Sequence, residues 1–187
     1  MRSFIGIDFS EELKDQIFSL QKTLKQYTTS GRWKNRDNFH LTLKFLGEID
    51  KEAIERIDWG MKDIAGSTSS FSLNISKAGV FPGKNIVRVL WLGLDGELNK
   101  LYSLQKTVDT KLEACGFEAE SRPYSPHVTI AQDLVFTSGF DEIQKQVGRL
   151  QFPQIHVNTI YLFKSEQVGA KRVYTHFREY AFCKRHP

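Results

Sequence analysis

His-Leu-Thr-Leu at residues 40–43 and His-Val-Thr-Ile at residues 127–130 are two tetrapeptides of the same form, and each lies inside a run typical of a β-strand. A strand sends alternate side chains to opposite faces. The histidine and the threonine of each tetrapeptide therefore share one face, and the two aliphatic residues share the other. The pattern predicts two strands that are anchored in a core by their aliphatic side chains and offer an imidazole and a hydroxyl group to a cleft.

The repetition of the motif, rather than either copy alone, is the informative signal. Strands are rich in threonine and aliphatic residues, so a single match has little meaning. Short motifs have a high false-positive rate, but two matches in one chain are expected by chance in only roughly one shuffled chain per thousand. The remaining histidines, His156, His176 and His186, do not match the pattern.

Two histidines, each with a neighbouring hydroxyl group, suit displacement at phosphorus. A neutral imidazole can take a proton from the nucleophile and a protonated one can give a proton to the leaving oxygen; a histidine with a pKa of about 6.5 can play either part. The threonine hydroxyls can donate hydrogen bonds to non-bridging phosphate oxygens. The sequence has no Gly-x-Ser-x-Gly elbow, phosphate-binding loop, dinucleotide fingerprint or zinc-ligand spacing, so we expect neither a cofactor nor a metal.

The overall composition is that of a soluble globular protein. Of the 187 residues, 40% are hydrophobic and 26% are charged, and the formal net charge is +4. No apolar run is long enough to span a membrane, and the N-terminal stretch lacks the features of a signal peptide. Cys115 and Cys183 are too few and too widely spaced for a disulfide framework. We therefore expect a cytoplasmic protein with reduced thiols.

Basic residues gather near both motifs. Those near the first are Arg32, Lys34, Arg36 and Lys44, and Arg122 precedes the second. They form either a solvated surface or a rim that attracts phosphate, and the sequence favours neither reading.

Short strands and amphipathic helices make up the chain. Strands are predicted at residues 4–9, 39–46, 71–75, 86–94, 127–131, 155–164 and 171–182, and helices after Ser10, after Asp50, over 97–115 and near 141–147. Residues 28–31 are expected to end the first helix, and residues 81–85 to form a turn. The unit of strand, helix, motif strand, helix and strand therefore occurs twice.

This order predicts an α+β fold. We expect two pseudo-symmetric lobes, each a mainly antiparallel sheet with helices on its outer face, and an active cleft between the lobes. No linker rich in proline or serine separates them. Residues 1–187 are therefore expected to form one compact domain.

These features together resemble the two-histidine (2H) phosphoesterase superfamily, and within it the bacterial and archaeal RNA 2′,3′-cyclic phosphodiesterases, also called 2′-5′ RNA ligases. The similarity extends over essentially the whole chain and includes residues 2–7, 39–47, 89–91 and 125–131. It implies hydrolysis of RNA ending in a 2′,3′-cyclic phosphate to a 2′-phosphomonoester without a metal. The same site working in reverse accounts for the ligase name.

The resemblance also assigns roles to the motif residues. His40 takes the position of the proton donor to the departing 3′ oxygen, and His127 that of the proton acceptor from the attacking water. Thr42 and Thr129 fall on the positions that hold the phosphate. Many family members carry an arginine five residues after the second histidine, whereas this chain has Gln132 there.

An amide brings no charge to the phosphate, so Arg36, Lys44 or Arg122 are candidates to replace the missing arginine. Tyr124 is a further candidate contact, because aromatic side chains commonly stack on the bases of single-stranded RNA.

Two alternatives remain open at the level of the sequence. One is a phosphodiesterase for a small cyclic phosphate, such as a nucleoside cyclic phosphate or ADP-ribose cyclic phosphate. The other is a non-catalytic module that binds RNA or a nucleotide. The expected partner is RNA with a 2′,3′-cyclic phosphate end, tRNA fragments included, with no membrane and no obligate protein partner.

Overall fold

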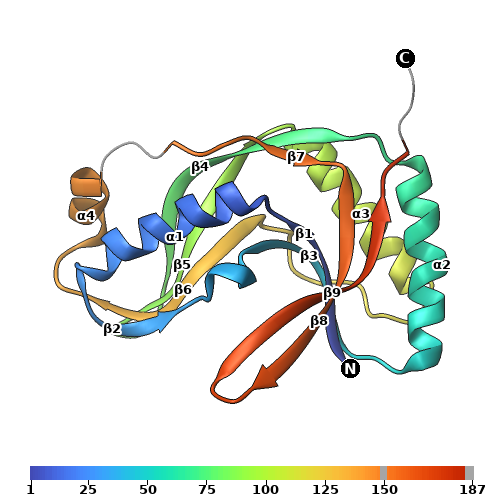
Figure 1. The fold of residues 1–187 in the computed structure, drawn as a ribbon, viewed down its shortest axis with the longest axis horizontal. Coiled ribbons are helices and arrows are strands. Elements are labelled where there is room, and N and C mark those ends of the chain that lie inside the picture. The colour runs from blue at the N-terminus through green and yellow to red at the C-terminus, as the bar shows by residue number, and fades with distance from the viewer. Residues whose placement is uncertain (148–150, 184–187) are drawn as a thin grey trace.

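Two antiparallel sheets form the framework of the computed structural model, which describes residues 1–147 and 151–183 (Figure 1). The first sheet has the order β3-β1-β8-β9, with β3 at His40–Glu48, β1 at Arg2–Asp8, β8 at Thr159–Val168 and β9 at Lys171–Ala181. The second has the order β2-β6-β5-β4-β7, with β2 at Thr28–Trp33, β6 at His127–Phe136, β5 at Val87–Gly96, β4 at Phe71–Pro82 and β7 at Ile155–Val157. The predicted α+β class is confirmed.

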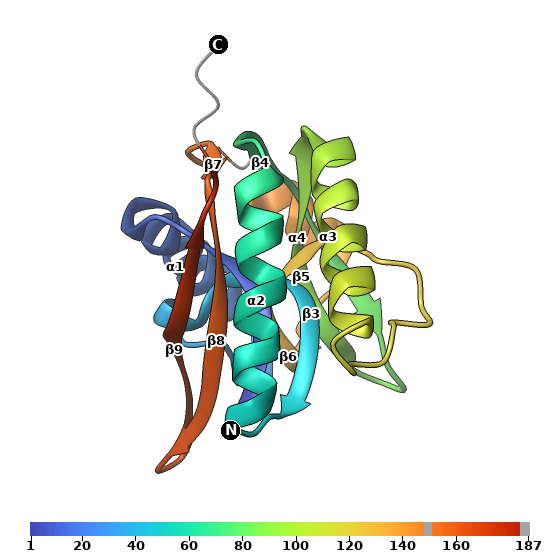
Figure 2. The same ribbon diagram turned by 90° about the vertical axis from the view of Figure 1, so that its right-hand side faces the viewer.

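Four α-helices accompany the sheets in the described part of the chain. They are α1 (Glu11–Lys25), α2 (Lys51–Ser67), α3 (Leu98–Glu113) and α4 (Phe140–Val147), and a short 3₁₀ helix, η1 (Arg36–Asn38), precedes β3. Helix α1 contacts β2 and α4 beside the second sheet, whereas α2 and α3 contact each other, β9 and β3 beside the first (Figure 2). Within residues 1–147 and 151–183, no helix combines the length and apolar character needed to cross a membrane.

Capping residues set where the first two helices begin. The Ser10 hydroxyl accepts a hydrogen bond from the Leu13 amide at 3.3 Å, and the Asp50 carboxylate accepts one from the Ala53 amide at 2.8 Å. Each cap satisfies a backbone donor that has no partner within the helix. Both predicted helix starts are confirmed.

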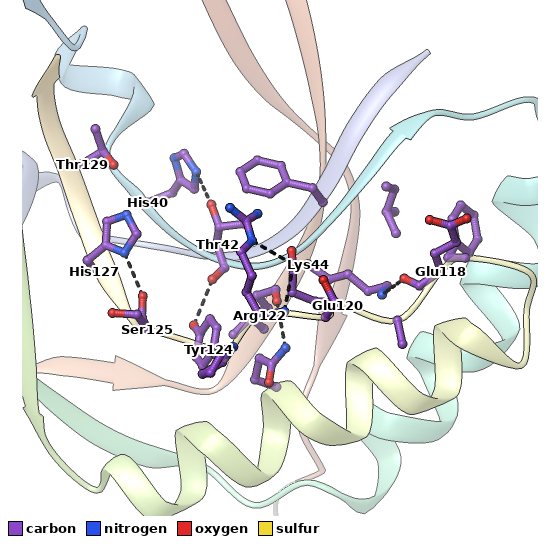
Figure 3. Close-up of a pocket in the computed structure, with 18 of the residues that line it drawn as sticks. His40, Thr42, Lys44, Glu118, Glu120, Arg122, Tyr124, Ser125, His127 and Thr129 are labelled. Atoms are coloured by element: carbon purple, nitrogen blue, oxygen red, sulfur yellow. Dashed lines mark hydrogen bonds and ion pairs between the residues drawn. The ribbon is translucent and has the colours of Figure 1, made fainter. Parts of the chain in front are cut away.

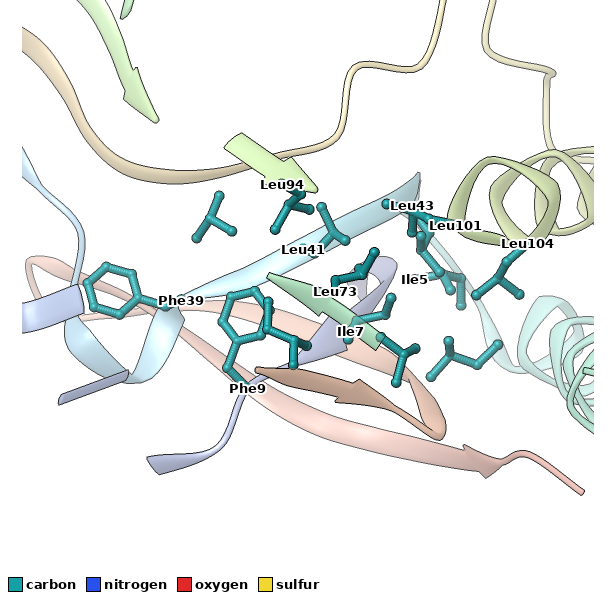
Figure 4. Close-up of a cluster of buried hydrophobic side chains, with 14 of the residues drawn as sticks. Ile5, Ile7, Phe9, Phe39, Leu41, Leu43, Leu73, Leu94, Leu101 and Leu104 are labelled. Atoms are coloured by element: carbon teal, nitrogen blue, oxygen red, sulfur yellow. The ribbon is translucent and has the colours of Figure 1, made fainter. Parts of the chain in front are cut away.

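Strand alternation separates the core from the cleft at both motifs. Leu41 and Leu43 are 1% and 3% exposed, and Val128 and Ile130 are 0% exposed. These side chains join one continuous hydrophobic cluster that includes residues of both sheets and of the helices (Figure 4). Full burial of each such side chain stabilises the fold by roughly 1.5–3 kcal/mol, so the motif strands are held firmly.

A β-bulge interrupts this alternation in β3. Gly6 of β1 pairs with Thr42 and Ile5 pairs with Lys44, so Leu43 has no partner in the register. Leu43 and Lys44 are both buried, and Phe45 is 73% exposed. The extra residue therefore turns the Phe45 side chain to the opposite face from the one that strict alternation predicts.

The two halves of the chain exchange strands. Strand β4 follows α2 in the first half, yet it pairs with β5 and β7 of the second half. Strand β8 follows α4 in the second half, yet it pairs with β1 of the first half. The predicted lobes are thus two sheets, each completed by two strands from the other half: β8 and β9 in the first sheet, and β2 and β4 in the second.

Three predicted boundaries need correction. Residues 28–31, expected only to end the first helix, begin β2, whose mostly exposed residues show no apolar alternation. The predicted strand at 155–164 is two strands, because the chain leaves the second sheet after Val157 and enters the first at Thr159. Phe81 and Pro82, expected in a turn, are the last residues of β4.

Candidate active site

The two motif histidines line one cleft. Strands β3 and β6 contact each other, and a cleft of about 920 Å³ opens beside them. Its lining includes His40, Thr42, His127 and Thr129, as the first prediction from the sequence required (Figure 3). Residues far apart in the chain therefore line the same cleft.

Both imidazole rings are held by the backbone in the same way. The Nδ1 atom of His40 lies 2.7 Å from the carbonyl oxygen of Asn38, and that of His127 lies 2.8 Å from the carbonyl oxygen of Ser125. A carbonyl can only accept a hydrogen bond, so each Nδ1 carries the proton and donates it. Each Nε2 is therefore the atom that can take up or release a proton.

The surroundings of His40 disfavour its charged form. Its ring packs against Phe4 at 4.6 Å and edge-on against Tyr174 at 5.2 Å between ring centroids. Burial lowers the pKa of His40 to about 4, and the positive charge of Lys34 acts in the same direction. The imidazole is neutral at pH 7 in the free protein.

Thr42 links the first motif to the loop that precedes the second. Its hydroxyl lies 2.9 Å from Nε2 of His40, and its carbonyl oxygen accepts a hydrogen bond of 2.9 Å from the Tyr124 hydroxyl. Burial raises the pKa of Tyr124 far above its usual range, so the phenol remains a donor. Tyr124 lines the cleft and acts here as a tie between β3 and the loop before β6.

Carboxylates already pair with the three cations proposed to replace the missing arginine. Arg36 lies outside the cleft lining, and its guanidinium donates to Asp15 at 2.6 Å and to Glu11 at 2.7 Å. The structure therefore gives no support to its predicted contact with a substrate in this cleft. Lys44 and Arg122 do line the cleft, but Lys44 is buried in an ion pair with Asp109 and Arg122 pairs with Glu120 at 3.2 Å.

Other lining residues escaped the sequence analysis. Gln132, which was identified, lines the cleft together with Phe81, Phe45 and Tyr174, which were not. The Phe81 ring stands edge-on to His127, with 5.4 Å between the centroids. Phe81 and Tyr174 lie far from either motif in the sequence, and Phe45 turns to the cleft only because of the β-bulge in β3.

Comparisons with known proteins identify the family. A family model described as LigT-like phosphoesterase matches residues 7–91 and again residues 92–174. A relative from Methanothermobacter thermautotrophicus, named RNA 2′,3′-cyclic phosphodiesterase, is 30% identical over 94% of this chain and 95% of its own. One from Thermotoga maritima with the same name is 32% identical over 84% and 81% of the two chains.

A solved structure has the same fold. The crystal structure of LigT from E. coli complexed with 3′-AMP superposes with a TM-score of 0.79 at 25% identity, over 98% of both chains. The paired strand motifs and the repeated match of the family model identify the class of protein as the 2H phosphoesterases. The chain belongs to the LigT-like phosphoesterase family.

Proposed function

We propose that this protein hydrolyses 2′,3′-cyclic phosphate ends of RNA to 2′-phosphomonoesters, with two histidines as acid and base. The observation that carries the proposal is the matched pair of imidazoles in one cleft, each with Nδ1 held by a backbone carbonyl. A module that only binds RNA has no need for two such proton-transfer groups. The names of the relatives support the choice of substrate.

The reaction follows from the roles of the four motif residues. The Nε2 atom of His127 takes a proton from water as the water oxygen bonds to phosphorus. The bond from phosphorus to the 3′ oxygen breaks, and His40 gives a proton to that oxygen. Thr42 and Thr129 hydrogen-bond the non-bridging oxygens as their charge increases. The product has a 2′-phosphate and a free 3′-hydroxyl. If the 5′-hydroxyl of a second RNA end takes the place of water, the same steps join the two ends through a 2′-5′ bond.

His40 must gain its proton when the substrate arrives. A phosphodiester anion in the same cleft favours the imidazolium over the neutral ring, which opposes the effect of burial. Once protonated, a histidine whose pKa is intrinsically low is a strong acid and a good donor to an alkoxide leaving group. The lowered pKa of about 4 in the free protein is compatible with the donor role on this basis.

The shape of the cleft favours RNA over a small cyclic nucleotide. Its lining follows β3 from His40 to Glu48, a length of about 25 Å at the usual rise of a strand. A substrate longer than one nucleotide fits such a cleft, and tRNA fragments with cyclic phosphate ends are included in the proposed class.

Cys115 and Cys183 are free thiols, which agrees with the cytoplasmic location expected from the sequence.

The deciding experiment incubates the purified protein with a short oligoribonucleotide that ends in a 2′,3′-cyclic phosphate, in the presence of EDTA. We expect full activity and a 2′-phosphomonoester product, identified by ³¹P NMR and by its resistance to a 3′-specific phosphatase. A 3′-phosphate product contradicts the assigned bond cleavage. Loss of activity with EDTA and recovery with added Zn²⁺ indicates a metal-bound water instead. A higher kcat/KM for ADP-ribose cyclic phosphate than for RNA favours the small-molecule alternative.

A further inference from the structure

The motif residues and Gln132 supply no positive charge to balance the negative charge of a phosphate. His40 is neutral in the free protein, and Thr42, Thr129 and Gln132 carry no charge. A phosphodiester anion that leaves water for such a site requires a positive partner.

Three cationic side chains line the cleft within the described residues, and only one of them is uncommitted. Lys44 is held by the carboxylate of Asp109, and its ammonium also donates to the Glu118 carbonyl at 2.6 Å. Arg122 is 84% exposed and pairs with Glu120. Lys34 has no carboxylate within ion-pair distance in residues 1–147 and 151–183.

The backbone of Lys34 is fixed beside the second motif. Its amide donates to the carbonyl oxygen of Ile130 at 3.0 Å, next to Thr129. Its carbonyl oxygen accepts a hydrogen bond of 3.0 Å from the Gln21 amide, which also donates to Ile130 at 2.7 Å. Gln21 is fully buried, so Lys34 starts from a rigid position.

The side chain of Lys34 is half-buried and close enough to the first motif to act on His40. Burial and the nearby positive charges of Arg32 and Arg172 lower the pKa of Lys34. An unpaired ammonium near two like charges is stabilised when an anion binds. Lys34 therefore lines the cleft that both motifs share, and its ammonium gains a charged partner only when a ligand binds.

We propose that Lys34 binds a non-bridging oxygen of the substrate phosphate and supplies the positive charge that Gln132 lacks. This assignment rests on the proposed function, because it concerns the phosphate group that His40 and His127 would process. It places the cation directly after the end of β2, beside β6, instead of on β6 itself. No step of proton transfer is assigned to Lys34.

The test replaces Lys34 and compares the variant with a matched loss of charge. Lys34→Gln is expected to raise KM for the cyclic phosphate oligonucleotide by about ten- to a hundredfold, the usual effect of losing a hydrogen bond to a charged group. Lys34→Arg is expected to restore most of the affinity. Arg32→Gln removes the same charge two residues away, but Arg32 is 72% exposed, pairs with Asp133 and does not line the cleft. The KM of the Arg32→Gln variant is expected to change less than threefold.

Equal losses in Lys34→Gln and Arg32→Gln overturn the proposal, since they indicate only the general field of the protein. The same holds if the effect of Lys34→Gln disappears at 0.5 M salt, where contributions from exposed charges are screened. Thermal unfolding of both variants shows whether the fold is retained.

A binding experiment separates this proposal from the catalytic one. Calorimetry with adenosine 2′-monophosphate and with adenosine measures the phosphate contribution without any turnover. Lys34→Gln is expected to weaken binding of the monophosphate and to leave binding of adenosine unchanged. Unchanged monophosphate affinity, or no binding by the wild-type protein, overturns the role of Lys34. A wild-type protein that binds the monophosphate through Lys34 but hydrolyses no cyclic phosphate instead refutes the proposed function alone.

Discussion

The carbonyl groups of Asn38 and Ser125 hold the two imidazoles in the same tautomer, although the rings belong to different sheets. Their environments nevertheless differ. His40 packs among Phe4, Phe163 and Tyr174, whereas His127 meets the edge of Phe81. A difference in environment between two titratable groups is how one site can provide an acid and a base at the same pH.

Replacement of either histidine is expected to slow hydrolysis strongly. His40→Ala and His127→Ala should each reduce kcat by roughly two to four orders of magnitude, since each removes one general acid–base contribution. The double variant should lose far less than the product of the two single losses, because the pair acts as a unit. Steady-state kinetics on the cyclic phosphate oligonucleotide measures all three.

A diester with a 4-nitrophenyl leaving group tells the two roles apart. This leaving group departs without protonation, so the substrate should rescue His40→Ala and leave His127→Ala inactive. Rescue of His127→Ala instead would show that the donor and acceptor assignments are reversed.

The pKa of His40 has a consequence for stability. Burial lowers it to about 4 in the folded protein, below the value of about 6.5 expected in the unfolded chain. The unfolded state therefore binds one more proton between these pH values, and stability is lost as pH falls from about 6.5 to about 4. We expect the free energy of unfolding of the wild type to fall by about 2–3 kcal/mol more between pH 7 and pH 4 than that of His40→Gln. Urea unfolding at the two pH values measures both. An equal loss in both proteins contradicts a buried neutral His40.

The sequence identified the motif residues but not their charged neighbours. Period-two alternation is local, so it was enough to place His40 and Thr42 on the cleft face. Ion pairs are not local: Lys44 meets Asp109, which lies 65 residues away. For this reason Lys44 was predicted to be free for substrate, and Lys34 did not emerge as the better candidate.

At the scale of elements, β3 is tied to the second half of the chain at two points. The Tyr124 hydroxyl donates to the Thr42 carbonyl (Figure 3), and the buried Lys44 ammonium pairs with Asp109 of α3. Tyr124 lies in the loop that leads into β6, and Asp109 lies in the helix before that loop. They hold this loop, and with it the start of the second motif, against the first motif strand.

Loss of the buried pair should affect stability more than substrate binding. Lys44→Met leaves the Asp109 carboxylate without its cation and is expected to destabilise the fold by about 3–5 kcal/mol. The double variant Lys44→Met/Asp109→Leu should be far less destabilised, because no buried charge remains. Urea unfolding measures both. A Lys44→Met protein that keeps its stability but binds adenosine 2′-monophosphate weakly would return Lys44 to the phosphate contacts.

Elements with a strong hydrophobic period were predicted well, and those without one were missed. Helix α1 was predicted by its caps and its apolar face, whereas β2 has an exposed surface and no such face. The break at Asn158 was also missed. Residues on both sides of it are extended and apolar, and only the pairing partners show that the chain changes sheets.

At the scale of the whole molecule, the exchange of β4 and β8 makes each half depend on the other. A chain divided after Lys84 separates β4 from both of its neighbours and β1 from β8. We expect residues 1–84 and 85–187 to be unfolded or aggregated when expressed alone, since each exposes unpaired strand edges. Mixed together, they should recover the circular dichroism of the intact protein. A fragment that folds alone with a cooperative transition contradicts the single compact domain expected from the sequence.

The crossed strands also bear on how a substrate can enter. A cleft between two independent lobes could open about a hinge. Here each sheet contains strands from both halves of the chain, so the chain passes repeatedly from one sheet to the other. Opening the cleft would strain the connections that pass between the sheets, the shortest of which is the single residue Asn158 between β7 and β8, so the gap between the two sheets should be preset. RNA would then thread its end along the open groove, and the histidines would meet the phosphate without any closing motion.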